Sequence, residues 1–143
     1  MTPRPATAAD AALLHAITLD AYAPWVPVVG ARPAPMDEDH AAQCAAGEAW
    51  LLEGDAAIVL REAPPGLLVD SVAVRTTAQG RGLGRALLAF AEEEARRRGR
   101  PVLWLYTNER MAANVTLYAR LGFRETHRAG EPPMRRVFME KTL

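Results

Sequence analysis

The segment Ser71–Arg85 constrains the fold more than any other part of the chain, because three glycines within five residues separate an apolar strand from an amphipathic helix. Glycine has no Cβ, so the turn can adopt positive φ and its main-chain amides can approach a ligand closely. The helix N-terminus adds unpaired donors and roughly half a positive charge. This strand–turn–helix unit predicts an anion site, above all for a phosphate or diphosphate.

Hydrophobic periodicity predicts alternating helices and strands along the rest of the chain. Thr7 and Asp10 resemble a capping box that begins the first helix. Asp37 is the expected N-cap of a second, short helix. Between them the prolines of 23–35 predict a semi-rigid loop. Strands are predicted at 49–52, 56–60, 67–74, 102–107, 123–129 and 136–140, and helices at 7–23, 37–47, 82–98 and 111–121.

The order of these elements predicts one domain spanning residues 1–143. The strand–helix–strand unit 67–107 implies a parallel pair of strands joined by a right-handed crossover. Hairpins on either side imply antiparallel pairing. The expected fold is α/β (α+β): a mixed, mostly antiparallel sheet of six to seven strands, flanked by about four helices.

Composition excludes several classes of protein. Seventeen basic and seventeen acidic residues cancel, which argues against a nucleic-acid binder. Cys44 is the only cysteine, so no intrachain disulfide forms, and the N-terminus lacks the apolar core of a signal peptide. The longest uncharged run has 11 residues and contains Pro24 and Pro27, too short to span a membrane. We therefore expect a cytoplasmic protein without a membrane segment.

Three familiar kinds of ligand site fit the sequence poorly. A Walker loop needs a lysine after the glycines, yet Lys141 is the only lysine. A dinucleotide fingerprint would require glycine where Arg85 stands and an acid about 20 residues later, where the chain reads Gly-Arg-Pro. The histidines show no metal-ligand spacing with one another or with Cys44, so we expect no metal site.

Two motifs resemble those of a known family. Gln79-Gly80-Arg81-Gly82-Leu83-Gly84, directly after an apolar strand, is similar to the Gln/Arg-x-x-Gly-x-Gly/Ala signature of the GNAT superfamily of acetyl-CoA-dependent N-acetyltransferases. Leu117–Phe123 resembles the second motif of that family, a helix ending in Leu-Tyr-x-x-x-Gly-Phe. The two motifs cover residues 66–125. One departure is that Met111 and Asn114 stand where the family has Asn and Ala, so Asn114 is a candidate replacement for the missing amide.

The resemblance implies that acetyl-CoA is the cosubstrate and that no metal takes part. It also implies how acetyl-CoA binds. The amides around the glycine turn would hold the diphosphate, and the strand before it would offer main-chain groups to the pantetheine arm. Asn114 shares a helix face with Tyr118. The implied coenzyme-binding residues are Val72, Ala73, Val74, Gln79, Gly80, Arg81, Gly82, Leu83, Gly84, Arg85 and Asn114.

Acetyl transfer needs a neutral amine and a proton for the departing thiolate. An alkylamine with a pKa of about 10.4 is neutral in only about one molecule in 2,500 at pH 7, so a general base is useful, directly or through water. Tyr118, matched to the family tyrosine, would protonate the CoA sulfur. Asp70 lies two and four residues before Val72 and Val74, so alternation puts all three side chains on one face. It is either the general base or a structural acid hydrogen-bonded at the end of the sheet.

The acceptor is left open by the sequence. The family forms its acceptor wall from the region that here contains Tyr22, Trp25 and Met36, which either shape an acceptor pocket or pack in the core beneath the proline-rich loop. Tyr106 and Asn108 lie at the end of the central strand near the same cleft, where Asn108 either contacts the acceptor amine or caps the next helix. The leading hypothesis is an enzyme that acetylates a primary amine by direct attack in a ternary complex. The alternatives are a non-catalytic acyl-CoA-binding regulatory module and a protein N-terminal or lysine acetyltransferase. A homodimer paired through edge strands also remains open.

Overall fold

The computed structural model describes all 143 residues, and its centre is a seven-stranded sheet of order β1-β2-β3-β4-β5-β7-β6. β4 and β5 pair in parallel and every other pair is antiparallel. The predicted fold class and the parallel pair are therefore confirmed. The strands are β1 Arg4–Pro5, β2 Ala49–Leu52, β3 Ala56–Ala63, β4 Gly66–Val74, β5 Val102–Asn108, β6 Arg124–Ala129 and β7 Arg136–Thr142.

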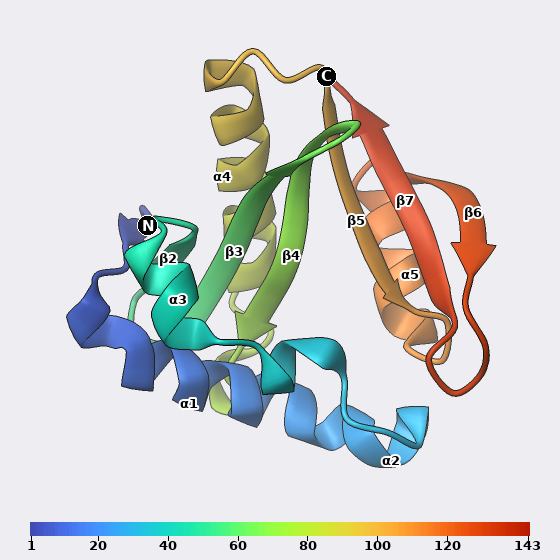
Figure 1. Ribbon diagram of the computed structural model, residues 1–143, viewed down its shortest axis with the longest axis horizontal. Helices are drawn as coiled ribbons and strands as arrows, with labels where there is room; N and C mark the ends of the chain where they lie inside the picture. Colours follow the sequence, from blue (N-terminus) through green and yellow to red (C-terminus); the bar gives the residue numbers. More distant parts are fainter.

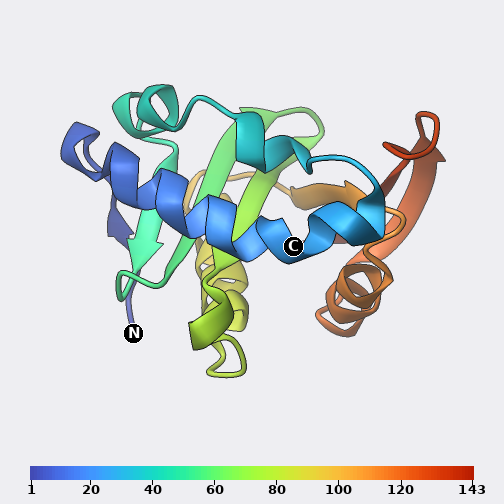
Figure 2. The ribbon, with the colours of Figure 1, turned by 90° about the horizontal axis from the view of Figure 1, so that it is seen from below.

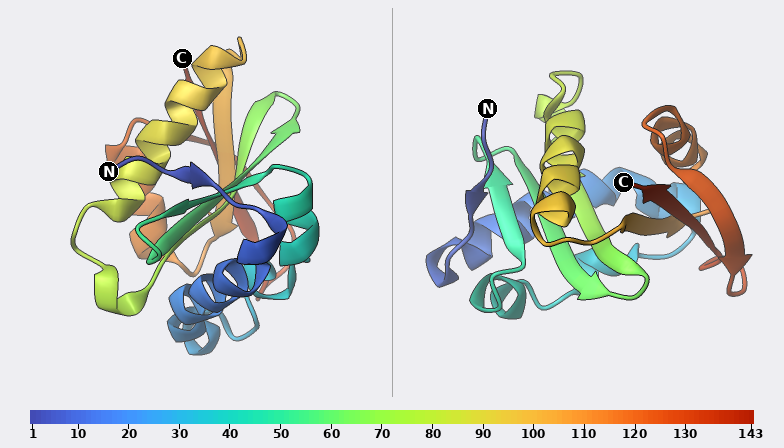
Figure 3. Two further views of the ribbon diagram at one scale, coloured as in Figure 1. Left: turned by 90° about the vertical axis from the view of Figure 1, so that its left-hand side faces the viewer. Right: turned by 90° about the horizontal axis from the view of Figure 1, so that it is seen from above.

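Helices cover both faces of the sheet (Figures 1 and 3). On one face α4 packs across β3, β4 and β5, and α5 packs on β5 and β6; on the other face α1 packs over β3 and β4, and α3 packs against α1. Each face buries its own apolar cluster, so the sheet is a central layer between two cores. The helices are α1 Ala11–Tyr22, α2 Val26–Val29, α3 His40–Ala45, α4 Leu83–Arg97 and α5 Ala112–Arg120, with short 3-10 turns η1 Ala8–Asp10, η2 Ala23–Trp25, η3 Ala34–Asp37 and η4 Thr76–Ala78.

The N-terminal helix continues further than predicted. The Asp10 carboxylate accepts a hydrogen bond from the Thr7 amide at 2.8 Å, as the predicted capping box requires. However, η2 and α2 carry the helical run through Pro24 and Pro27, where we expected a loop. Each proline occupies the first turn of a new helical segment, where its missing N–H has no helical acceptor. The predicted cap of the next helix is also wrong, because Asp39 and not Asp37 accepts from Ala42.

The run Ala8–Val29 meets the length and composition of a membrane-crossing helix, with a mean hydropathy of 1.3. A buried core helix and a signal sequence pass the same test, and 28% of the tested window of this run is buried inside the domain. Here Leu14, Ile17 and Val29 are buried in the domain itself. In the view of Figure 1 the run lies beneath the strands, and Figure 2, seen from below, shows it crossing in front of the gap between β4 and β5.

The parallel strands β4 and β5 touch only at one end. Leu67–Val69 pair with Leu103–Leu105, and beyond these residues the two strands diverge (Figure 1). Gly66 stands at the closed end, where a Cβ would overlap the Val102 carbonyl oxygen. The absence of a side chain at Gly66 therefore lets the strands meet.

We expect Gly66→Ala to lower the free energy of unfolding by about 3 kcal/mol, the upper part of the range for overpacking, because the obstructing atoms are backbone. Chemical denaturation measures this change. Gly84→Ala is the matched control, since neither glycine needs positive φ and a Cβ at Gly84 would lie 3.7 Å from Val74 Cγ2. Equal stability of Gly66→Ala and the unmodified protein would contradict the close approach.

Candidate active site

The divergence of β4 from β5 opens a cleft with two pockets. The smaller, about 60 Å³, lies between the strands and the η3 segment, and the larger, about 400 Å³, extends to the glycine turn and the start of α4. The residues that line both pockets mark where they meet; these are Tyr22, Val72, Asn114 and Tyr118. A molecule in one pocket therefore meets a molecule in the other beside these four side chains.

A β-bulge in β4 lies at the centre of the cleft. Ser71 pairs with Val59 and Val69 with Leu60, so Asp70 has no partner across the strand. The bulge reverses the alternation of side chains. Val72 and Val74 pack against the α4-side core, whereas Asp70 lies beside Arg61 on the other face. Our expectation that Asp70 shares a face with the two valines is therefore wrong.

The glycine turn presents a row of free donors to the larger pocket. The backbone amides from Gln79 to Arg85 donate to no acceptor within the protein, and the first bonded amide of α4 is that of Ala86. Gly80 and Gly82 have φ of +83° and +80°, and a Cβ on either would meet no atom within 4 Å. This row of amides at a helix N-terminus is suited to a diphosphate.

The turn is fixed from outside by side chains of other elements. The Thr76 amide donates to Asp20 of α1 at 2.8 Å. The Arg81 guanidinium pairs with Glu53 at 3.2 Å and with Asp55 at 3.4 Å, both in the β2–β3 turn. Arg81 thus offers the cleft only its main chain.

Two tyrosines stand where the pockets meet. The Tyr22 hydroxyl donates to the Val72 carbonyl oxygen at 3.1 Å. The Tyr118 hydroxyl makes no hydrogen bond within the protein, and Tyr118 packs edge-on against Phe123. Burial, with a smaller effect of Tyr22, raises the pKa of Tyr118 well above its usual value. Tyr118 is therefore a protonated phenol free to donate into the cleft.

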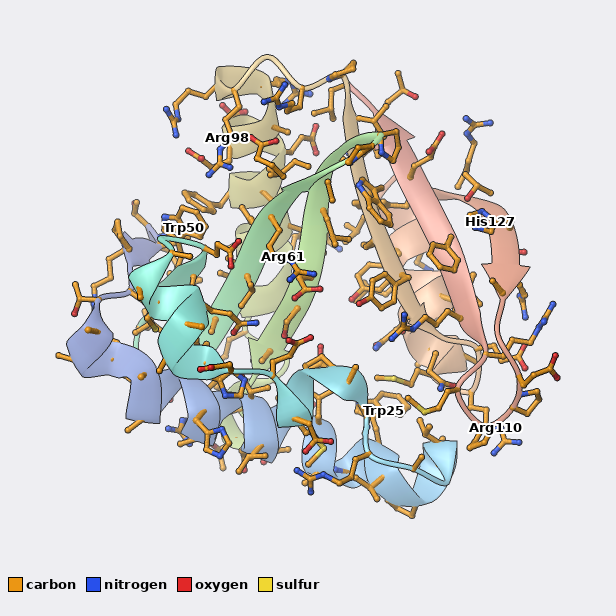
Figure 4. All side chains as sticks on the ribbon, viewed as in Figure 1. Trp25, Trp50, Arg61, Arg98, Arg110 and His127 are labelled. Atoms are coloured by element: carbon orange, nitrogen blue, oxygen red, sulfur yellow. The ribbon has the colours of Figure 1, made fainter.

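Charged groups gather around the smaller pocket. The Asp70 side chain is 2% exposed, and its Oδ1 lies 3.6 Å from Arg61 and 3.4 Å from the Tyr106 hydroxyl. Its Oδ2 is buried without a hydrogen-bond partner. The Arg136 guanidinium lies 4.3 Å above the Tyr106 ring. Burial raises the pKa of Tyr106, and the charge of Asp70 raises it further. Figure 4 shows Arg61 on the face of the sheet away from α4.

Arg110 connects the β5–α5 connection to the N-terminal helical run. Its guanidinium donates to the Val29 carbonyl at the end of α2, at 2.8 Å. Asn108 holds the neighbouring loop, since its side-chain amide donates to the Pro133 carbonyl at 2.7 Å. The helical run and the β5–α5 connection are thereby joined.

The structure brings most of the predicted site residues to the cleft. Tyr106 and Asn108 line the smaller pocket with Asp70, whereas Trp25 lines the larger pocket. Met36 is 5% exposed and lines neither pocket. Ala73 and Leu83 are buried in the cores, so only their main chains are available to a coenzyme.

Sequence reasoning missed several residues of the smaller pocket. Arg136 is one of them, although an arginine at the start of a strand that pairs with an aromatic-rich strand is a recognisable sign of a binding residue. Pro33 and Pro35, interpreted only as loop residues, form the wall opposite the strands. Met111 and Met134 add flexible apolar lining.

The histidines are arranged differently from the expectation. His15 and His40 place their Nδ1 atoms 2.8 Å apart, a proximity that their sequence spacing did not indicate. Burial lowers the pKa of His40, and the charge of the neighbouring His15 lowers it further. No group of three or more His, Cys, Asp or Glu side chains gathers in a way that could hold a metal ion.

A family model described as an acetyltransferase (GNAT) domain matches residues 38–125. The chain is also 44% identical over 55 residues to the Escherichia coli K12 ribosomal protein bS18-alanine N-acetyltransferase. That match covers 38% of this chain and 37% of the relative, so the chain spans little more than a third of the length of the curated relatives it matches.

Solved structures resemble the whole chain. A ribosomal-protein-alanine N-acetyltransferase from Brucella melitensis superposes with a TM-score of 0.75 at 27% identity, covering 100% of both chains. The PaiA N-acetyltransferase from Thermoplasma acidophilum, in complex with coenzyme A, superposes with a TM-score of 0.73 at 16% identity, covering 99% of this chain and 98% of that one.

Proposed function

The chain belongs to the GNAT acetyltransferase family, and on that premise we propose that it transfers an acetyl group from acetyl-CoA to a primary amine by direct attack in a ternary complex. The observation that carries this proposal is the meeting of two pockets at Tyr22, Val72, Asn114 and Tyr118. One pocket has a row of free main-chain amides and the other a buried carboxylate. Two substrates bound together would react where the pockets join.

The residues of the larger pocket fit the coenzyme. Free amides from Gln79 to Arg85 suit the diphosphate, and the unpaired edge of β4 beyond Val69 suits an extended arm with amide groups. The Val72 carbonyl is already bonded to Tyr22, so other main-chain groups of β4 would bind that arm. Acetyl-CoA supplies the acetyl group and a thiol leaving group.

The protein's own residues would manage the protons. As the amine nitrogen forms its bond to the acetyl carbonyl carbon, Asp70 accepts a proton from the nitrogen. The carbon–sulfur bond breaks with its electron pair going to sulfur, and Tyr118 donates a proton there. The raised pKa of Tyr118 keeps this proton available at neutral pH.

A protein N-terminus is the second candidate acceptor. The similarity to ribosomal-protein-alanine N-acetyltransferases favours it, because the names of the matched Escherichia coli and Brucella proteins give an alanine of a ribosomal protein as the acceptor. The smaller pocket would then receive the first residue of the chain.

The proposal is tested by following free thiol after acetyl-CoA is mixed with amines, aminoglycosides, amino acids and peptides. Acceptor-dependent thiol release, with the acetylated product identified by mass, is the expected result. Initial velocities should give intersecting lines when both substrates are varied. Binding of acetyl-CoA without thiol release for any acceptor would instead support a regulatory module, and parallel lines would contradict direct attack.

We expect Asp70→Asn to lower kcat/KM for the acceptor by roughly a hundredfold, the lower end of the range for a general base. The effect is limited because water can also carry the proton. The amide keeps the shape of the side chain but cannot take a proton, so the rise of kcat/KM with pH should flatten. An unchanged pH profile would leave Asp70 with only a structural role.

A further inference from the structure

The smaller pocket contains only two charged side chains, one of each sign. Asp70 and Arg136 both line it, and the other fifteen lining residues are apolar or uncharged. A pocket intended for a simple alkylamine would need only the carboxylate. The presence of Arg136 in this pocket therefore needs an explanation of its own.

Asp70 brings an unused acceptor atom to this pocket. Its side chain is 98% buried, and Oδ2 has no hydrogen-bond partner in the protein. A buried carboxylate oxygen left without a donor is costly, so a ligand that supplies an N–H there gains binding free energy. An ammonium or amine group supplies that donor.

Arg136 brings unused donors to the same pocket. Nearly all arginines of this chain make an ion pair or a hydrogen bond within the protein. The three that make neither are Arg85, Arg120 and Arg136. Arg85 lies at the larger pocket and Arg120 is exposed on α5. Arg136 is half-buried, its direct contact is the face of Tyr106 at 4.3 Å, and Glu38 lies near enough for the two charges to interact without forming an ion pair.

Stacking on Tyr106 fixes the plane of the Arg136 guanidinium and leaves its N–H groups free. Such a planar fork matches a carboxylate, which it can bind through two parallel hydrogen bonds. Tyr106 also reaches Asp70 with its hydroxyl, so one tyrosine connects the anion and the cation of the pocket.

We propose that the acceptor is a small zwitterion, an amino acid whose amine meets Asp70 Oδ2 and whose carboxylate meets Arg136. This proposal rests on the proposed function and names its substrate class. The pocket volume of about 60 Å³ limits the acceptor group to about one small residue, so the unpaired guanidinium of Arg136, and not the volume, favours a free amino acid over a peptide N-terminus. The remaining wall contains Pro33, Pro35, Met111 and Met134, so an apolar side chain fits better than a charged one.

The test compares L-amino acids with their own carboxamides in the thiol-release assay. The carboxamide has the same shape without the negative charge, and its amine is less basic, so intrinsic reactivity favours the amide. We expect kcat/KM for the preferred amino acid to exceed that for its amide by at least about tenfold, the effect of a hydrogen bond to a charged group. β-Alanine and γ-aminobutyrate measure the spacing between amine and carboxylate.

Arg136→Gln should bring the ratio of acid to amide close to one. Arg120→Gln is the matched control, because it removes another unpaired arginine outside both pockets and should leave the ratio unchanged. Thermal unfolding of each variant checks that it is folded, and the comparison on the unmodified protein holds even if Arg136→Gln is not.

The outcomes separate the two proposals. Amides or peptides with a free N-terminus acetylated as fast as amino acids, or faster, would overturn the zwitterion while the acetyltransferase proposal stands. A ratio that Arg136→Gln leaves unchanged in a folded protein would remove Arg136 from recognition. If no acceptor in the panel gives thiol release, both proposals are overturned.

Discussion

Gly82→Val is expected to weaken acetyl-CoA binding by at least about a hundredfold, measured by calorimetry. Gly82 lines the larger pocket, and a side chain there would take up open space, since no atom lies within 4 Å of the position of its Cβ. Loss of two hydrogen bonds to a charged group costs roughly 3 kcal/mol or more, which gives the hundredfold figure. An affinity equal to that of the unmodified protein would rule out the glycine turn as the diphosphate site.

Backbone strain complicates this variant, because Gly82 has φ of +80°. Gly47→Val is the matched control: Gly47 has φ of +71°, nothing lies within 4 Å of its Cβ position, and it stands outside the cleft. It should lose similar stability and keep its affinity for acetyl-CoA. Loss of affinity in both variants would point to strain and not to the site.

Tyr118→Phe is expected to lower kcat by about 10- to 1,000-fold, the effect of removing a positioned acid, with little change in acetyl-CoA affinity. The ring remains to pack against Phe123, so only the hydroxyl is lost. Because the pKa of Tyr118 is raised above its usual value, the phenol stays protonated as the pH rises to about 10. The unmodified enzyme should therefore show no fall in kcat below that pH.

Two results would count against this role. An unaltered kcat in Tyr118→Phe would remove the hydroxyl from the mechanism. A fall in kcat of the unmodified enzyme near pH 8 would show that the proton comes from a group with a lower pKa.

The family and the order of elements were predictable because they depend on local pattern. The strand–glycine–helix unit and the Leu-Tyr-x-x-x-Gly-Phe helix are each contained in a short window, and membership of the GNAT family is confirmed by the family model. The strands at 49–52 and 67–74 agree with β2 and β4 to within one residue. Local propensity and hydrophobic alternation decide such boundaries.

The details of the site were less predictable because they depend on contacts distant in sequence. A single bulge at Asp70, opposite Val59 and Leu60, moved its side chain to the other face. The pairing of Arg136 with Tyr106 depends on the antiparallel register of β5 and β7. Met36 is buried because the proline-rich segment forms helical turns and not an open loop.

Asp20, Glu53 and Asp55 hold the glycine turn in place by a hydrogen bond and two ion pairs. This order affects the kinetics of coenzyme binding. A binding loop that is ordered beforehand loses little conformational entropy when it captures a ligand. Association should therefore proceed in one kinetic phase whose rate increases linearly with acetyl-CoA concentration, without a slower rearrangement. Neutralising Asp20 would let the turn move, and would reveal that second phase.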